Sequence, residues 1–175
     1  MKIHSESLIS HSREKVYTAY RDRLPQLAAY IPDIKRIDEV SREDLATSVK
    51  LHNIWIADRD IPRVMQMVVK PEMLQWDDYA EWITADWSCK WSLKLRVFTE
   101  SVTCGGLNTF TETSNGKTRM LISGDLDIDL ANMRGVPRLL APSLKPQIEK
   151  FIVSLITPNL EKVNVALERY LNEQR

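Results

Sequence analysis

The chain has 175 residues, of which 43% are hydrophobic and 27% charged, and its 24 Lys and Arg balance 24 Asp and Glu. This size and balance predict a single globular domain over residues 1–175. A net charge near zero gives no long-range attraction to nucleic acid or to an anionic membrane. No stretch approaches the roughly 20 apolar residues of a membrane span, so neither nucleic acid nor an integral membrane segment is expected.

The N-terminal part predicts one strand followed by two short helices. Residues 2–9 alternate weakly between apolar and polar side chains, as a short strand does. Ser12 is a suitable N-cap for a helix that ends near Arg23. Pro25 is tolerated only in the first turn of a helix, so a second helix begins there, and Pro32 ends it.

The next hundred residues are rich in strand patterns. The expected strands cover residues 34–43, 46–57, 75–87, 90–98 and 118–130. In the second of these, Leu51, Asn53 and Trp55 share one face, and Leu93 and Leu95 share a face in the fourth. The last has the sharpest alternation, with Met120, Ile122 and Leu126 on one side.

Between these strands the sequence is punctuated by breaks. Residues 61–74 predict either a short helix or an irregular strand, and periodicity does not decide between them. Gly105-Gly106 and Asn115-Gly116 mark breaks, and the second is a hairpin-type dipeptide.

The C-terminal part predicts one long amphipathic helix over residues 143–171. Its apolar residues recur at steps of three and four and include Ile148, Phe151, Ile152, Leu155, Ile156, Leu160, Val163, Leu167 and Leu171. Pro146 suits the first turn of this helix. Pro158 lies in its interior, where it removes one backbone hydrogen bond and is expected to kink the helix near Ser154.

This order of elements predicts a cavity. A sheet with one wet and one dry face is antiparallel as a rule, and the long helix is the only large apolar element available to cover the dry face. A twisted, curved sheet contacts one helix along a line. The remaining gap predicts a pocket lined by aliphatic and aromatic side chains.

The whole chain resembles the START-related superfamily, also called SRPBCC. The resemblance rests on the opening Ile3-Xaa-Ser5 strand, the Ser12–Tyr20 helix, the Leu27–Asp33 run that ends near a proline, and the Ile148–Leu171 stripe. It implies an α+β helix-grip fold, in which a curved antiparallel sheet of about six or seven strands surrounds a long C-terminal helix, with two short helices after the first strand. Members bind lipids, polyketides, steroids or other hydrophobic molecules, and include cyclases. No catalytic signature of the family is found here.

Ten residues are predicted to line the cavity: Asn53, Trp55, Trp82, Trp91, Leu93, Leu95, Met120, Ile122, Phe151 and Leu155. Each Trp has core packing as its alternative role. Asn53 either orients the polar group of a ligand or bonds to a neighbouring strand. The segments 61–74 and 132–142 are candidate lips of the cavity, or else packed connections.

The acidic residues, histidines and cysteines do not predict a catalytic or metal site. Asp77, Asp78, Glu81 and Asp86 form an acidic stretch that we interpret as a solvated strand edge rather than a metal site. The three histidines lack metal-ligand spacing and are expected at the surface, with His52 on the wet face. Cys89 and Cys104 are expected to be buried free thiols, with a single bridge as the alternative. No metal or organic cofactor is expected.

Three functions remain open. The first is binding or carriage of a hydrophobic small molecule. The second is an enzyme of cyclase or hydratase type, with its acid or base among Asn53, Asp78, Tyr79, Tyr30 and Glu112. The third is a protein-interaction module with a filled cavity. The charged start of the chain lacks a signal-peptide pattern and predicts a cytoplasmic protein; the sequence does not specify an oligomeric state.

Overall fold

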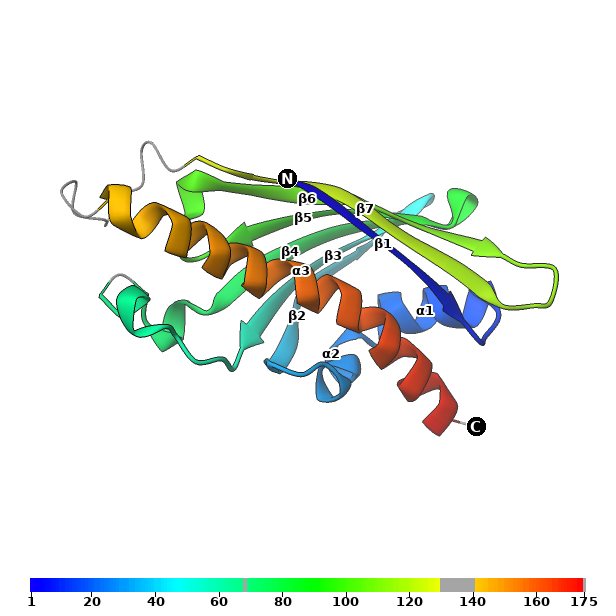
Figure 1. Cartoon of the computed structure of the whole chain (residues 1–175). Coiled ribbons are helices and arrows are strands. Elements are labelled where there is room, and N and C mark those ends of the chain that lie inside the picture. The colour runs from blue at the N-terminus through cyan, green and yellow to red at the C-terminus, as the bar shows by residue number, and fades with distance from the viewer. Residues whose placement is uncertain (68, 130–140, 175) are drawn as a thin grey trace.

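A computed structural model describes residues 1–67, 69–129 and 141–174 (Figure 1). Its strands form one seven-stranded antiparallel sheet in the order β1-β7-β6-β5-β4-β3-β2. The helices and strands are β1 (Lys2–Ile9), α1 (Arg13–Asp22), α2 (Leu24–Leu27), η1 (Ala28–Tyr30), β2 (Ile34–Asp44), β3 (Ser48–Ala57), η2 (Arg63–Met65), η3 (Pro71–Met73), β4 (Gln75–Ile83), η4 (Thr84–Asp86), β5 (Ser88–Leu95), η5 (Thr99–Ser101), β6 (Val102–Glu112), β7 (Thr118–Ile128) and α3 (Ala141–Glu173).

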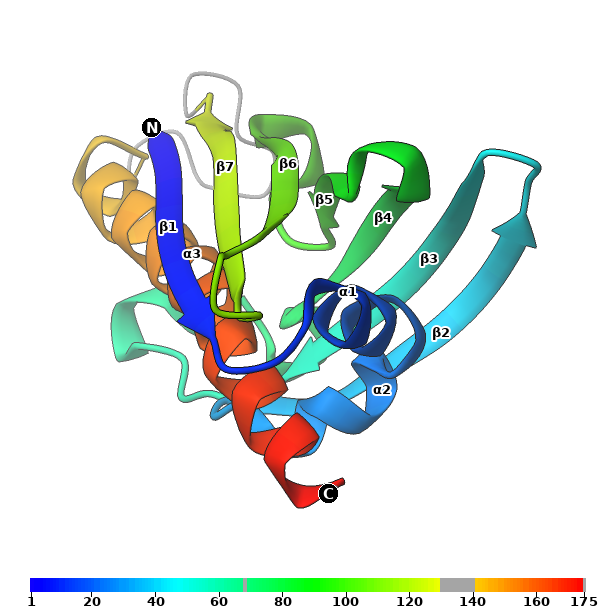
Figure 2. The same cartoon turned by 90° about the vertical axis from the view of Figure 1, so that its right-hand side faces the viewer.

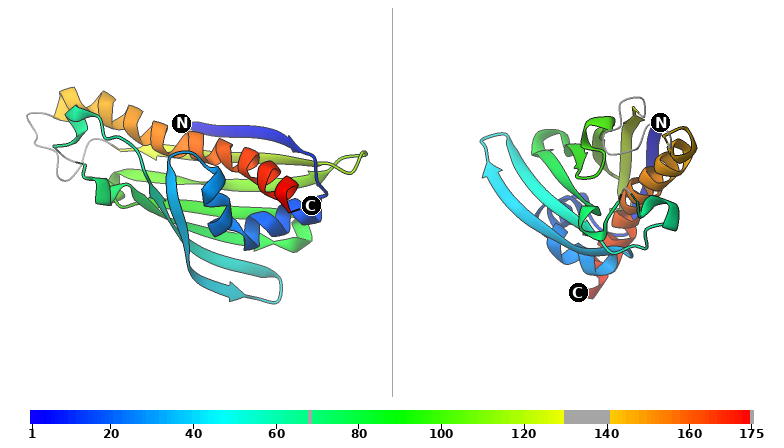
Figure 3. Two further views of the ribbon diagram at one scale, coloured as in Figure 1. Left: turned by 90° about the horizontal axis from the view of Figure 1, so that it is seen from below. Right: turned by 90° about the vertical axis from the view of Figure 1, so that its left-hand side faces the viewer.

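The sheet curves around α3, which runs along its concave face (Figures 1 and 2). The short helices α1 and α2 lie by the C-terminal half of α3 and close the same face (Figure 3). One continuous cluster of buried apolar side chains joins the sheet to all three helices. The predicted α+β helix-grip fold is therefore confirmed.

The N-terminal boundaries follow the predicted signals. Ser12 is the N-cap of α1, and its carbonyl accepts the Val16 N–H at 3.1 Å, although its side chain makes no cap bond. Pro25 lies in the first turn of α2, where its missing N–H leaves no helical partner unsatisfied. Tyr17 and Tyr20 lie on the buried face of α1, and both rings contact Trp82 of the sheet.

The alternation of the strands also sorts the side chains as expected. On β3, Leu51, Asn53 and Trp55 are buried, while His52 and Ile54 between them are half-buried. On β7 the buried set includes Met120, Ile122 and Leu126, and on β5 it includes Trp91, Leu93 and Leu95. The concave face is the dry one.

Three local predictions were wrong or undecided. Gly105-Gly106 does not break the chain, because β6 runs through both residues and pairs with β5 and β7. The strand expected over 75–87 ends at Ile83, where a 3-10 turn begins and Trp87 takes a left-handed φ of 50°. In 61–74, the short-helix alternative is the nearer one, since the described residues form two separate three-residue 3-10 helices, η2 and η3.

The helix α3 is continuous through both of its prolines. It begins at Ala141, two residues before the expected start, so Pro146 lies inside the helix rather than in its first turn. Pro158 cannot donate to the carbonyl of Ser154, four residues earlier. The Arg59 guanidinium donates to that carbonyl instead, so the side chain replaces the lost backbone bond.

Candidate functional site

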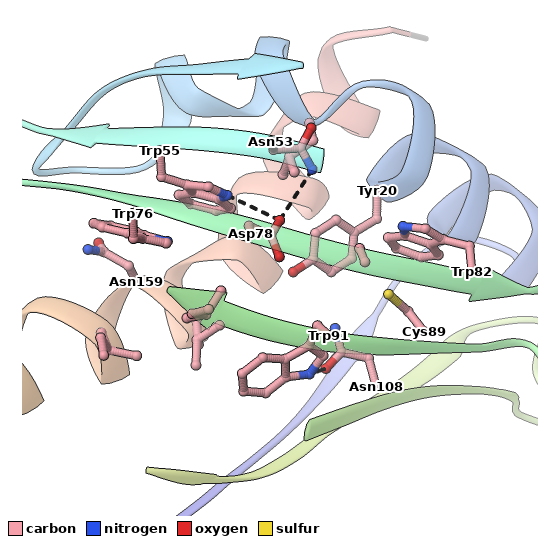
Figure 4. A pocket seen from close by; sticks show the side chains of 15 residues that line it. Tyr20, Asn53, Trp55, Trp76, Asp78, Trp82, Cys89, Trp91, Asn108 and Asn159 are labelled. Carbon is pink, nitrogen blue, oxygen red and sulfur yellow. Dashed lines mark hydrogen bonds between the residues drawn. The ribbon is translucent and has the colours of Figure 1, made fainter. Parts of the chain in front are cut away.

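A cavity lies between the concave face of the sheet and the middle of α3 (Figure 4). Its lining comes from four strands and three helices: Tyr20, Leu24, Asn53, Trp55, Trp76, Asp78, Ala80, Trp82, Cys89, Trp91, Leu93, Asn108, Ile156, Asn159 and Leu160. None of these side chains is a Lys, an Arg or a His. The lining is therefore aromatic and amide-rich, with one carboxyl group.

The cavity is narrow. Its empty volume is about 530 Å³ when the part open to solvent is counted, but the space open to the centre of a water molecule is about 30 Å³. A water molecule needs roughly 10–15 Å³ of such space, so the cavity as it stands holds about two. Anything larger must displace side chains.

Asp78 is the centre of the polar lining. Its Oδ2 accepts hydrogen bonds from Asn53 Nδ2 at 3.2 Å and from Trp55 Nε1 at 3.3 Å, as the dashed lines in Figure 4 show. Burial raises the pKa of this carboxyl from 3.8 to about 6, although both hydrogen bonds act to lower it. The group thus titrates near neutral pH.

A second polar pair lies on the opposite wall. The Trp91 indole donates to Asn108 Oδ1 at 2.8 Å, and both residues are buried. Burial and the nearby Asp78 raise the pKa of Tyr20 well above its usual value, although a hydrogen bond with Asn108 lowers it. Tyr20 therefore presents a neutral hydroxyl to the cavity.

Three buried polar atoms of the lining have no hydrogen-bond partner among the described residues. They are Asn53 Oδ1, Trp82 Nε1 and Asn159 Oδ1. Each residue is at most 3% exposed. Since buried polar groups are nearly always paired, unpaired atoms around one cavity indicate a place for a polar molecule.

The aromatic side chains form two groups around these polar atoms. Trp55 and Trp76 stack with centroids 5.7 Å apart and planes at 19°. Tyr20 meets Trp82 edge-on, with centroids 5.1 Å apart. Both groups offer flat apolar surface beside the carboxyl group.

Five of the ten predicted lining residues lie around this cavity. They are Asn53, Trp55, Trp82, Trp91 and Leu93. The other five are buried in the core outside its lining: Leu95, Met120, Ile122, Phe151 and Leu155. The dry face is longer than the cavity, and α3 packs directly against β1 and β7 over the rest. A role in ligand binding stays a prediction for the first five.

The interpretation of Asp78 as part of a solvated edge was wrong. It is 8% exposed and shares the dry face of β4 with Trp76 and Trp82, while Asp77 faces outward. The signal was available, because an even spacing from two tryptophans places a residue on their face. Tyr20, Asn108 and Asn159 were also missed.

Three further acid–base candidates lie away from the cavity. Tyr79 is 45% exposed and stacks on His52. Tyr30 donates to Glu173 at 2.5 Å, and Glu112 lies 3.9 Å from Arg13. Of the enzyme candidates, only Asn53 and Asp78 line the cavity.

The candidate lips have a mixed outcome. No residue of 61–74 lines the cavity among those described, although Met65 is buried and Met67 is 72% exposed. The second segment, 132–142, falls outside the described residues up to position 140.

The histidines and cysteines were also assigned positions from the sequence. His11 is buried and lies 3.1 Å from Asn172 Oδ1, so its predicted surface position was wrong. His52 faces outward, 2.8 Å from Asp77. Cys89 and Cys104 are buried free thiols, as predicted. The described ranges contain no group of His, Cys, Asp and Glu suited to a metal ion, and no helix in them has the length and apolarity needed to cross a bilayer.

Comparison with known proteins finds similarity at the level of structure. No family model and no curated protein matches the sequence. The solved structure of TTHA0849 from Thermus thermophilus matches with a TM-score of 0.68 at 17% identity, covering 99% of both chains. The Zhui aromatase/cyclase of a Streptomyces species matches with a TM-score of 0.64 at 11% identity, covering 98% of this chain and 95% of that one. A START superfamily protein from Mycobacterium smegmatis matches with a TM-score of 0.56 at 14% identity over 99% of both chains. These likenesses establish a shared fold.

Proposed function

We propose that the chain, whose helix-grip fold is that of START superfamily proteins and aromatase/cyclases, binds a small hydrophobic molecule in the cavity between its sheet and α3. The observation that carries the proposal is the set of unpaired polar atoms at Asn53, Trp82 and Asn159. Leaving such atoms unsatisfied costs free energy, and a ligand with a polar group recovers it. The stacked Trp55 and Trp76 provide the apolar wall.

A ligand must widen the cavity, and α3 is the wall best placed to move. Ile156, Asn159 and Leu160 line the cavity on either side of Pro158. The helix lacks a backbone bond at this point, so bending it there disrupts fewer hydrogen bonds than bending it elsewhere. We infer that ligand entry displaces this part of α3 from the sheet.

The test uses two tryptophan substitutions on α3. Leu160→Trp fills the cavity from the helix side, whereas Val165→Trp adds the same side chain at a position that is 60% exposed. Native mass spectrometry of the purified wild-type protein is expected to show a bound small molecule. Val165→Trp retains it and Leu160→Trp loses it.

A second readout covers a ligand lost during purification. The neutral dye Nile red is expected to fluoresce with the wild type and with Val165→Trp, and only weakly with Leu160→Trp. The proposal is wrong if the wild type carries no small molecule and takes up no dye, or if Leu160→Trp behaves as the wild type does.

A second candidate function is acid–base catalysis of the cyclase or hydratase type. Asp78 supports it, because a buried carboxyl with a pKa of about 6 exchanges protons readily near neutral pH. Asn53 and Trp55 fix its orientation, and Tyr20 supplies a neutral hydroxyl across the cavity. No acid–base role is proposed for Tyr79, Tyr30 or Glu112.

Catalysis and simple binding predict different effects of Asp78→Asn on the molecule that is found bound to the protein. An enzyme whose Asp78 is replaced retains its substrate, so native mass spectrometry is expected to find different bound masses in the variant and the wild type. A hydratase changes the mass by one water. The same bound molecule in both proteins favours binding without catalysis. Asp77→Asn, on the outer face of the same strand, is the matched control.

A cytoplasmic location and a single domain over residues 1–175 are part of the same proposal. Two buried free thiols support the location, since secreted proteins tend to use their cysteines in disulfides. The one core shared by the sheet and the three helices supports the single domain. The interaction-module alternative receives no specific support.

A further inference from the structure

The described lining of the cavity contains an acidic side chain but no basic one. Of the described residues that line it, Asp78 carries the one carboxyl group and none is a Lys, an Arg or a His. Asp78 takes part in none of the ion pairs formed by the described residues. A buried carboxylate without a partner is costly, because low-dielectric surroundings do not replace its hydration.

The hydrogen bonds around Asp78 nevertheless fit the ionised form. Both groups that reach it, Asn53 Nδ2 and Trp55 Nε1, are donors, and both bond to Oδ2. An ionised carboxylate accepts hydrogen bonds only, whereas a carboxylic acid needs an acceptor for its O–H. The second oxygen, Oδ1, accepts no hydrogen bond from any described residue.

Among the residues that the structure describes, no neighbouring titratable group supplies the missing positive charge. Tyr20 of α1 and Cys89 of β5 face the cavity, and burial raises the pKa of both so that they stay neutral. His52 of β3 points to the outer face, where it pairs with Asp77. The lining residues described on α2, α3 and β6 are Leu24, Ile156, Asn159, Leu160 and Asn108, and none of these five is titratable.

The unpaired polar atoms are mostly acceptors. Asn53 Oδ1 and Asn159 Oδ1 are two unpaired acceptors, against one unpaired donor at Trp82 Nε1. An ammonium group has three donors and no acceptor, so it matches this excess. Flat aromatic faces, here Trp55 and Trp76, attract cations through the ring quadrupole.

We propose that the ligand of this cavity is a small organic cation, a protonated amine on a flat apolar body, whose ammonium group pairs with the Asp78 carboxylate among the tryptophan rings. This inference rests on the proposed function and names its ligand class. The amine supplies the counter-ion that no described residue provides. The Trp82 N–H is left to bond a hydroxyl or carbonyl elsewhere on the ligand.

The experiment compares matched amines and alcohols. Wild-type protein is titrated by calorimetry with benzylamine, phenethylamine and naphthylmethylamine, and with the corresponding alcohols, at neutral pH. At least one amine is expected to bind about tenfold more tightly than its alcohol, a preference typical of a desolvated charge pair with a cation–π contact. Asp78→Asn removes the preference, and Asp77→Asn keeps it.

A pH series gives a readout that does not depend on the variant folding. Amine affinity in the wild type is expected to rise as the pH increases through about 6, because Asp78 must lose its proton to bind an ammonium. Alcohol affinity is expected to stay level or fall over the same range. A falling amine affinity contradicts the inference.

The outcomes separate this inference from the proposed function. Amines that bind no more tightly than their alcohols, or that keep their preference in Asp78→Asn, overturn the inference. If the wild type still takes up Nile red and Leu160→Trp does not, the proposed function stands even though the inference has failed. Absence of binding by every amine, alcohol and dye, together with no bound molecule in native mass spectrometry, overturns both.

Discussion

At the scale of single residues, Asp78 is a buried carboxyl group with no ion-pair partner among the described residues. Its neighbours on β4, Asp77 and Glu81, hold their carboxyl groups on the outer or half-buried side, where solvent and cations reach them. Asp77 pairs with His52 and Arg96. The pKa of Asp77 is therefore lowered and that of its neighbour Asp78 is raised. This difference can be tested by replacing each residue in turn.

The first prediction concerns stability against pH. The folded-state pKa of Asp78, about 6, exceeds the ordinary value of 3.8. The folded protein thus binds an extra proton between these values, and this contribution to the free energy of unfolding is complete below 3.8 and lost as the pH rises through 6. The shift corresponds to roughly 3 kcal/mol. Relative to the wild type, Asp78→Asn is expected to gain that amount between acid and neutral pH in urea unfolding.

Asp77→Asn supplies a control of opposite sign. Burial raises the pKa of Asp77, but hydrogen bonds from His52 and Arg96 outweigh burial and lower it. Its contribution to stability is therefore present above 3.8 and lost as the pH falls below that value. Two variants that change with pH in the same direction contradict the assignment of Asp78.

The sequence is sufficient to predict which face of the strand Asp78 occupies, but not which residues surround its carboxyl group. Alternation along Trp76, Asp78, Ala80 and Trp82 places it on the dry face. A run of nearby acidic residues suggested solvent instead, since charge clusters usually lie outside. The register that brings Asn53 opposite Asp78 comes from strand pairing, which a single sequence does not specify.

At the scale of elements, the two glycines of β6 and their partner on β7 explain a strand that looked like a break. Trp91 of β5 stands opposite Gly106, which in turn stands opposite Gly124. A Cβ added at Gly106 lies 2.7 Å from the Trp91 ring and 2.1 Å from the Ser123 carbonyl oxygen. The missing side chains make room for the indole, so here glycine marks a packing site rather than a turn.

The second prediction follows from that contact. Gly106→Ala is expected to destabilise the protein by about 2–3 kcal/mol, because both the backbone and the Trp91 ring must shift. The displaced indole also loses its bond to Asn108 and changes the cavity wall. Urea unfolding and the wavelength of tryptophan emission measure the two effects.

Gly105→Ala is the matched comparison for this prediction. Its added Cβ points to the other face of β6, with its nearest neighbour, the Trp91 carbonyl oxygen, at 3.0 Å. A smaller loss of stability and no change of the indole environment are expected. Equal effects of the two substitutions mean that Gly106 does not accommodate the ring.

The elements that pattern alone predicted well are those with a long regular period. The α3 stripe and the alternation of β7 extend over many residues, so chance agreement is small. The connection 61–74 has no such period, and its described residues form two 3-10 helices, η2 and η3. The Arg59 contact that supports Ser154 in α3 links residues 95 positions apart, and no local pattern encodes it.

At the scale of the whole molecule, the sheet has two edges with unequal protection. The β1 edge lies against α3: Asn164 donates to Ser7 Oγ at 2.8 Å, and Glu168 accepts the Ser10 N–H at 2.9 Å. The β2 edge extends away from the helices at its far end, as Figures 2 and 3 show. Every residue of β2 from Glu39 to Asp44 is exposed.

The far half of β2 carries features that discourage pairing with another chain. The register of β2 against β3 shifts between Glu39 and Ser41, as at a bulge. Arg42 pairs with Asp44 and with Asp22 of α1. Bulges and charges on an edge strand oppose sheet-to-sheet association, so this edge is open to solvent without being an evident docking strand.

The third prediction is that amide hydrogen exchange separates the two edges. Residues 39–44 are expected to exchange far faster than residues 3–9, because opening the far end of β2 exposes little apolar surface whereas opening β1 also detaches α3. The centre of the sheet, β4 to β6, is expected to exchange most slowly. Exchange measured by mass spectrometry on peptides from the three regions gives the order directly. If β2 and β1 exchange alike, then α3 does not stabilise its edge of the sheet.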